Sequence, residues 1–172
     1  MPNGLMPSHM HEGLATLLET ELTQGGRGRS AFFRMLQRKG VESRAWGKSF
    51  SPIDRMDGVA SLFPQGTSAY FFGYYLYEEL WKRKGSKGIY DFTDSTSSSI
   101  PYFLHRPLHA VYGDDVSYES LWKDIFTKKK AESEAELQEI KKRPLSTLKY
   151  FTKGRQNKWD LARTADGKWA AY

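Results

Sequence analysis

His11 and Glu12, in the stretch HMHEGLATLLETE, have the residue types and spacing that begin a zinc-binding motif. An HExxH helix binds zinc through two histidines four residues apart, and the glutamate between them acts as a general base. Here the fifth place of the pattern is Ala15, and no HExxH occurs anywhere in the 172 residues. The stretch is therefore not a complete zinc motif, and Glu12 needs another explanation.

The other histidines give no complete motif either. His105 and His109 are four residues apart, the spacing that brings two side chains to one helical face. Pro107 lies between them and disturbs a helix unless it falls in the first turn, and no glutamate accompanies the pair. His9 and His11 alternate along the chain instead of stacking on one helical face. The spacing alone therefore does not predict a metal site at these positions.

The hydrophobic pattern around Glu12 predicts a helix. Its predicted apolar stripe consists of Met10, Leu14, Leu17, Leu18 and Leu22. We expect Glu12, Thr16 and Glu19 on the opposite side. Because Glu12 then lies near the start of the helix and away from the apolar stripe, its carboxylate could reach a metal without being buried in the core.

Four further helices are predicted, one of them a short helix over residues 101–112 that Pro107 disturbs unless it lies in the first turn. Ser30 can cap a short helix that Gly40 closes, and Ser117 can begin a long, increasingly charged helix that Pro144 ends. Between them, FPQGTSAYFFGYYLYEELWKRKG predicts a helix up to Gly85 with Tyr70, Tyr74, Tyr77 and Trp81 on one stripe. Gly73 costs such a helix about 1 kcal/mol unless close packing uses its missing side chain, so we expect another backbone to approach it.

The end of the chain has a different pattern. KWDLARTADGKWAAY contains two short alternating segments around Ala165-Asp166-Gly167, which is typical of a β-hairpin. A single hairpin is marginally stable alone. The sequence therefore predicts a mainly α fold, with a helical domain over residues 1–143 and a linker with the start of a β domain over residues 144–172.

Composition restricts the possible classes. Of the 172 residues, 39% are hydrophobic and 15% aromatic, which is typical of a globular domain. Without cysteine, any metal must be held by His, Asp or Glu. No stretch approaches the roughly 20 apolar residues of a membrane helix. The N-terminal MPNGLMPSHM is not typical of a signal peptide, and it is compatible with a start inside a longer reading frame.

The positive charge suggests an alternative function. The net charge is +6, and residues 25–48 hold seven basic residues against Glu42 alone. With Phe32, Phe33 and Trp46 they could form a basic-aromatic surface for nucleic acid or another acidic partner. The simpler reading is a solvated helix face whose aromatic rings point inward. Because no nucleic-acid motif accompanies the charge, and GGRGR lacks the Lys-Ser/Thr ending of a phosphate loop, nucleic-acid binding is the less favoured interpretation.

Four segments together resemble a known family. They are MPNGLMPSHMHEGLATLLETE, GRGRSAFFRML, FPQGTSAYFFGYYLYEELWKRKG and VYGDDVSYESLWKDIF. Over roughly residues 1–130 the chain resembles the second half of a gluzincin zinc metallopeptidase domain, of the type fused to TolB-like β-propellers, with aminopeptidase N as a more distant relative. ADGKWAAY is similar to the first strand of a propeller blade.

The resemblance implies roles for two residues. Glu12 in HEGLAT matches the glutamate that, after an upstream HExxH helix, completes a His, His, Glu zinc site. Tyr70 in AYFFG matches a tyrosine that donates a hydrogen bond to the oxyanion of the tetrahedral intermediate, although Ala69 stands where that pattern has proline. Without the resemblance, Glu12 is an ordinary carboxylate near a helix N-terminus and Tyr70 an ordinary packing residue.

The resemblance also implies a function. We expect a fragment or truncated relative of a thermolysin- or aminopeptidase-like hydrolase, acting on peptides or proteins with zinc as cofactor in an intact parent. Its partners would be an N-terminal HExxH segment and a C-terminal β-propeller, in a periplasmic or extracellular setting. The 172-residue chain alone is expected neither to bind catalytic zinc tightly nor to cleave peptides. The alternative is a noncatalytic helical binding module.

Overall fold

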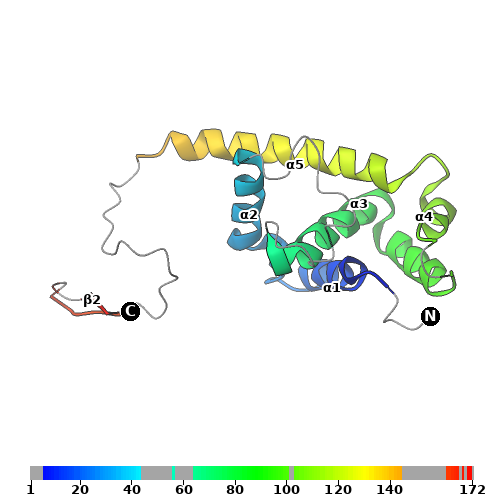
Figure 1. The fold of residues 1–172 in the computed structure, drawn as a ribbon, viewed down its shortest axis with the longest axis horizontal. Helices are drawn as coiled ribbons and strands as arrows, with labels where there is room; N and C mark the ends of the chain where they lie inside the picture. The colour runs from blue at the N-terminus through cyan, green and yellow to red at the C-terminus, as the bar shows by residue number, and fades with distance from the viewer. Residues whose placement is uncertain are drawn as a thin grey trace. The chain divides into compact units, whose positions relative to one another are not determined.

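The computed structural model describes residues 6–43, 56, 64–100, 103–144, 162–166, 168 and 170–171. It divides into two compact units, residues 1–142 and 143–172. Within the described part, the first unit contains five α-helices and no strand (Figure 1). They are α1 (Ser8–Leu22), α2 (Ala31–Glu42), α3 (Ser68–Ser97), α4 (His105–Tyr112) and α5 (Tyr118–Lys141), with short 3-10 turns at Arg27–Arg29 and Gln65–Thr67. The prediction of a mainly α fold is confirmed.

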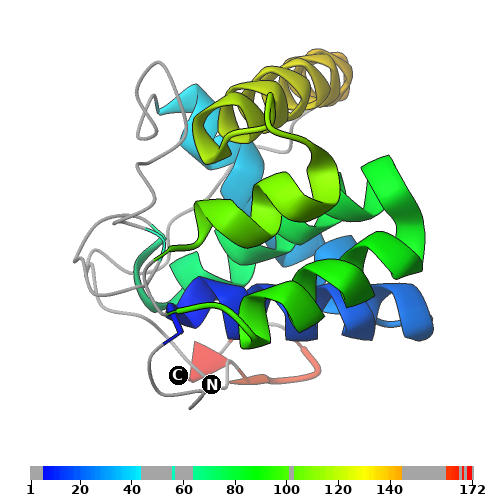
Figure 2. The same ribbon diagram turned by 90° about the vertical axis from the view of Figure 1, so that its right-hand side faces the viewer.

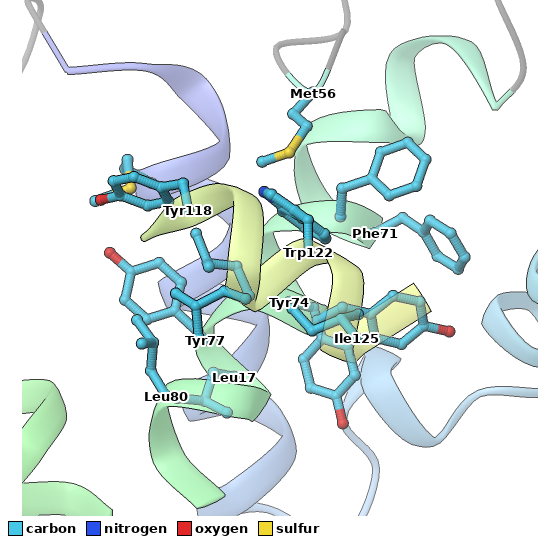
Figure 3. Packing of buried hydrophobic residues seen from close by; sticks show 14 of the residues in the cluster. Leu17, Met56, Phe71, Tyr74, Tyr77, Leu80, Tyr118, Trp122 and Ile125 are labelled. Carbon is cyan, nitrogen blue, oxygen red and sulfur yellow. The ribbon is translucent and has the colours of Figure 1, made fainter. Parts of the chain in front are cut away.

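Helix α3 is the centre of the first unit. It packs against α1, α4 and α5, and Figure 2 shows α1 and α3 side by side. From Ala69 to Tyr77 every residue except Tyr70 is buried, as expected for a helix that is covered on all sides. Figure 3 shows this cluster, in which Phe71, Tyr77 and Leu80 of α3 lie close to Leu17 of α1 and Trp122 of α5.

Local sequence explains where several helices begin and break. The Ser30 hydroxyl accepts a hydrogen bond from the Phe33 backbone N–H at 3.2 Å, and Ser117 forms a capping box with Ser120, so both predicted caps are confirmed. Helix α2 continues two residues beyond Gly40. At Gly85 the backbone leaves helical geometry (φ 63°), which glycine tolerates. A helical stretch that was not predicted follows to Ser97.

The prediction of which face of α1 is buried is wrong, because the buried face is rotated by part of a turn from the predicted one. Leu18 and Leu22 are 37% and 74% exposed, whereas Thr16, expected on the opposite side, is fully buried. The residues that face the core are His9, Met10, Gly13, Thr16, Leu17 and Thr20. Small side chains allow α1 to lie closer to α3 than leucines would, and the Thr16 and Thr20 hydroxyls donate to the Glu12 and Thr16 carbonyls, which satisfies them inside the contact.

The second unit contains a two-residue strand pair. β1 (Ala162–Arg163) pairs antiparallel with β2 (Ala170–Ala171), with Ala162 opposite Ala171 and Arg163 opposite Ala170. In the turn, the Asp166 Oδ1 atom accepts hydrogen bonds from the Thr164 hydroxyl and the Lys168 backbone N–H. The pair surrounds the Ala165-Asp166-Gly167 segment, of which Gly167 lies outside the described residues.

Candidate functional site

The two residues matched to a peptidase site lie where α1 and α3 cross. Gly13, directly after Glu12, meets Gly73, three residues after Tyr70. A Cβ added at Gly73 would lie 2.7 Å from the Gly13 Cα, closer than real Cβ atoms approach. The expectation that another backbone approaches Gly73 is confirmed. Glu12 precedes Gly13 by one residue and Tyr70 precedes Gly73 by three residues, so both lie within one helical turn of the crossing.

Arg27 connects Tyr70 with the C-terminal half of α1. Glu19 is seven residues after Glu12, which is about two turns along the same flank of α1. Its carboxylate accepts a hydrogen bond from Arg27 Nε at 2.8 Å, and the Arg27 guanidinium lies 4.7 Å above the centroid of the Tyr70 ring. This contact joins Tyr70 to Glu19, which lies on the flank of α1 that also carries Glu12.

Both side chains have accessible polar groups. Glu12 and Tyr70 are each half-buried. Within the described part of the chain, the Glu12 carboxylate forms no ion pair and the Tyr70 hydroxyl no hydrogen bond. By contrast, Tyr74 and Tyr77 are buried, and burial raises the pKa of both phenols well above the usual range. Of these three tyrosines of α3, Tyr70 is thus the one suited to donate a hydrogen bond outward.

Glu12 fits a metal site as a single ligand and not as a complete set. Among the described residues, no group of three or more His, Asp or Glu side chains is arranged to hold a metal ion. His9 is buried with interactions of its own, and His11 is exposed on α1. A zinc ion at Glu12 would need its other protein ligands from elsewhere, so no catalytic step through the metal follows from these residues alone.

A groove that the sequence did not predict lies between α2, α3 and α5, lined largely by charged and amide side chains, with a volume of about 600 Å³. Gln37 of α2 connects the other two helices. Its amide oxygen accepts a hydrogen bond from the Tyr75 hydroxyl at 2.5 Å, and its amide nitrogen donates to the Lys129 carbonyl and the Ser133 hydroxyl. The Lys129 ammonium lies 3.0 Å from Glu78, 3.2 Å from Glu132 and over the Tyr75 ring. Gln37 and its three partners are 38 to 96 residues apart, so no local spacing predicts these hydrogen bonds.

The basic-aromatic segment is partly neutralised. Arg27, Arg38 and Lys39 pair with Glu19, Glu136 and Glu42. Phe33 is buried against Phe71, whereas Phe32 is 51% exposed, and Arg34 is exposed elsewhere on the same helix. Arg44, Trp46 and Lys48 lie outside the described residues. Of the described basic residues between 25 and 43, Arg29 and Arg34 are the two without a carboxylate partner in the described part of the chain.

Comparisons of the chain with protein-family models, curated proteins and solved structures give no match. None of the described helices combines the length and the apolar character needed to cross a bilayer.

Proposed function

We propose that the helical unit is the second half of a gluzincin-like zinc peptidase domain, in which Glu12 is the third protein ligand of zinc and Tyr70 donates to the oxyanion. Its support is that the Gly13 and Gly73 contact lies within one helical turn of both residues, and that Arg27 joins Tyr70 to Glu19 on the flank of α1 that carries Glu12. Small residues at the contact allow a helix that carries a metal ligand to lie close to the other helix.

The chemistry would divide between the two residues. Zinc, when bound, supplies Lewis-acid activation of water and of a peptide carbonyl. Glu12 would contribute a carboxylate oxygen to the metal, and two histidines of an HExxH motif would complete the ligand set. Because the 172 residues contain no HExxH, those two histidines would come from another segment. The Tyr70 hydroxyl would stabilise the developing oxyanion, a contribution of typically a few kcal/mol. The proposal includes a peptide or protein substrate, a following TolB-like β-propeller and a periplasmic or extracellular location.

Zinc binding tests the role of Glu12. The chain extended by the in-frame coding sequence upstream of Met1 should retain zinc, and Glu12→Gln should weaken zinc affinity by about tenfold or more. Glu21→Gln is the matched control, because Glu21 is exposed on the same helix. The 172-residue chain alone should bind no zinc tightly. Unchanged zinc affinity in Glu12→Gln, or zinc-dependent hydrolysis by the 172 residues alone, contradicts the proposal.

Peptide hydrolysis by the same extended chain tests Tyr70. Tyr70→Phe should keep the zinc content and lower kcat by about a hundredfold, with a smaller change in KM, because the hydrogen bond is formed in the transition state. Tyr90→Phe, an exposed tyrosine of the same helix, is the control. Equal kcat values in the two variants leave Tyr70 as a packing residue.

A noncatalytic binding module is the second candidate. It is favoured by the exposure of Phe32 and Arg34 on α2, while the ion pairs of Arg27, Arg38 and Lys39 argue against a strongly charged surface. Binding of single-stranded DNA or RNA that weakens steeply with salt, and that Phe32→Ala and Arg34→Ala reduce, would support it. The absence of salt-dependent binding would eliminate the nucleic-acid form of this candidate.

A further inference from the structure

The pair His105 and His109 lies on a regular helix. Pro107 is the third residue of α4, within the first turn, where a missing N–H donor does not interrupt helical hydrogen bonds. Pro107 therefore does not disturb the helix that carries the two histidines. His105 begins the helix and His109 follows one turn later, so both side chains share a face.

The two imidazole rings are close enough for one ion. Their centroids are 6.1 Å apart and their planes are inclined by 60°. With metal–nitrogen bonds of about 2.0–2.1 Å, two imidazoles on one ion have centroids roughly 5 Å apart at a tetrahedral angle and about 4.5 Å apart at the right angle of a tetragonal Cu²⁺ site. A side-chain rotation that brings the rings together by about 1–1.5 Å would suffice. His105 is exposed and His109 half-buried, which leaves room for that rotation and for an ion.

The surroundings favour a cation at this face. His109 lies in the last turn of α4, and its carbonyl accepts the Gly113 N–H that closes the helix, so the negative end of the helix dipole is adjacent. The His105 ring stands edge-on to Tyr118, with centroids 5.4 Å apart, and the Tyr118 hydroxyl donates to the Leu104 carbonyl at 3.4 Å. Tyr118 thereby supports one ring from the start of α5.

We propose that His105 and His109 form a bidentate site for a divalent late transition metal ion, separate from Glu12 and independent of the proposed peptidase function. Imidazole pairs bind Cu²⁺ more tightly than Ni²⁺ or Zn²⁺. Because the described residues provide no third protein ligand, water fills the other coordination positions. Neutral imidazoles are required, so acidification weakens binding.

Cu²⁺ titration of the 172-residue chain, followed by calorimetry and by electron paramagnetic resonance, tests the site. One ion per chain should bind with a signal of two coordinated nitrogens and should broaden the Tyr118 ring resonances. His105→Ala and His109→Ala should each weaken this binding by about tenfold or more. His11→Ala, which changes an exposed histidine on α1, should leave it unchanged.

A relocated histidine provides the sharper control. The double variant His109→Ala/Ala110→His keeps the number of histidines, but turns the second ring about 100° around the helix. Ala110 is exposed, and the variant retains the contact between His105 and Tyr118. Loss of the two-nitrogen signal with unchanged helical circular dichroism supports the site. Cu²⁺ affinity equal to that of the parent chain in this variant or in both single variants overturns it. Persistence of the signal in Glu12→Gln separates this outcome from that of the zinc proposal.

Discussion

At the scale of single residues, Arg27 connects two parts of the candidate site. It pairs with Glu19 of α1 and covers the ring of Tyr70 of α3. Because the Arg27 side chain is 44% exposed, the ion pair itself contributes little, and the contact with the ring adds about 0.5–1 kcal/mol. We expect its larger effect to be on the orientation of the Tyr70 phenol.

Arg27→Ala should therefore change the environment of Tyr70 more than it changes stability. We expect the ring resonances of Tyr70, assigned with Tyr70→Phe, to shift, and the free energy of unfolding to fall by about 1 kcal/mol or less. Arg29→Ala is the matched control, since the Arg29 guanidinium donates to the Thr23 carbonyl instead. If both variants move the Tyr70 resonances equally, Arg27 has no specific role in orienting the ring.

Glu78 gives the groove a pH dependence. Burial alone would raise its pKa, but the ammonium groups of Lys129 and Lys82 outweigh burial and hold the pKa of this carboxyl below its ordinary value of 4.5. A carboxyl with a lowered pKa in the folded state stabilises the fold above its unfolded pKa, and this stabilisation is lost as the pH falls below about 4.5 and through the folded pKa.

Glu78→Gln should lower the free energy of unfolding at pH 7 by about 1–3 kcal/mol, because it leaves Lys129 with Glu132 alone. The difference from the parent chain should shrink as the pH is lowered from 5 to 3 in urea titrations. Glu139→Gln, which removes an exposed ion pair with Lys142, should have little effect at either pH. A difference for Glu78→Gln that is constant with pH would show that charge is not the cause.

At the scale of helices, the contact between α1 and α3 depends on two glycines. In an open helix Gly→Ala would stabilise by about 1 kcal/mol. At Gly73 the added Cβ would collide with the His9 carbonyl and with Gly13 Cα, so we expect Gly73→Ala to destabilise by about 1–3 kcal/mol in chemical denaturation. Gly25→Ala meets no atom within 4 Å and should be nearly neutral. Equal stability of the two variants would contradict the close crossing.

The same helix pair shows what the sequence could and could not predict. Periodicity located α1, and the cost of Gly73 in a helix predicted a backbone neighbour. Periodicity also selected Leu18 and Leu22 for the core, because it counts apolar side chains and not the distance between backbones. A close crossing selects Gly13, Thr16 and Thr20 instead. The groove around Gln37 was missed for another reason, since its partners meet only after α2, α3 and α5 have packed.

At the scale of the whole chain, the described apolar core lies entirely in the first unit. Its buried members run from Met10 to Ile125, whereas the second unit contributes a two-residue strand pair to the described structure. A hairpin of this size is marginally stable alone. The free energy of unfolding of the helical unit should therefore depend on residues 1–142.

A chain ending at Lys142 tests this expectation. Its thermal midpoint, followed by circular dichroism at 222 nm, should lie within about 2 °C of that of the 172-residue chain, because no member of the core cluster is removed. Ending the chain at Phe126 is the comparison: it removes the Lys129 and Ser133 partners of Gln37 and should lower the midpoint by several degrees. If both truncations lower the thermal midpoint equally, residues 143–172 stabilise the helical unit, and the loss of the Gln37 contacts has no additional effect.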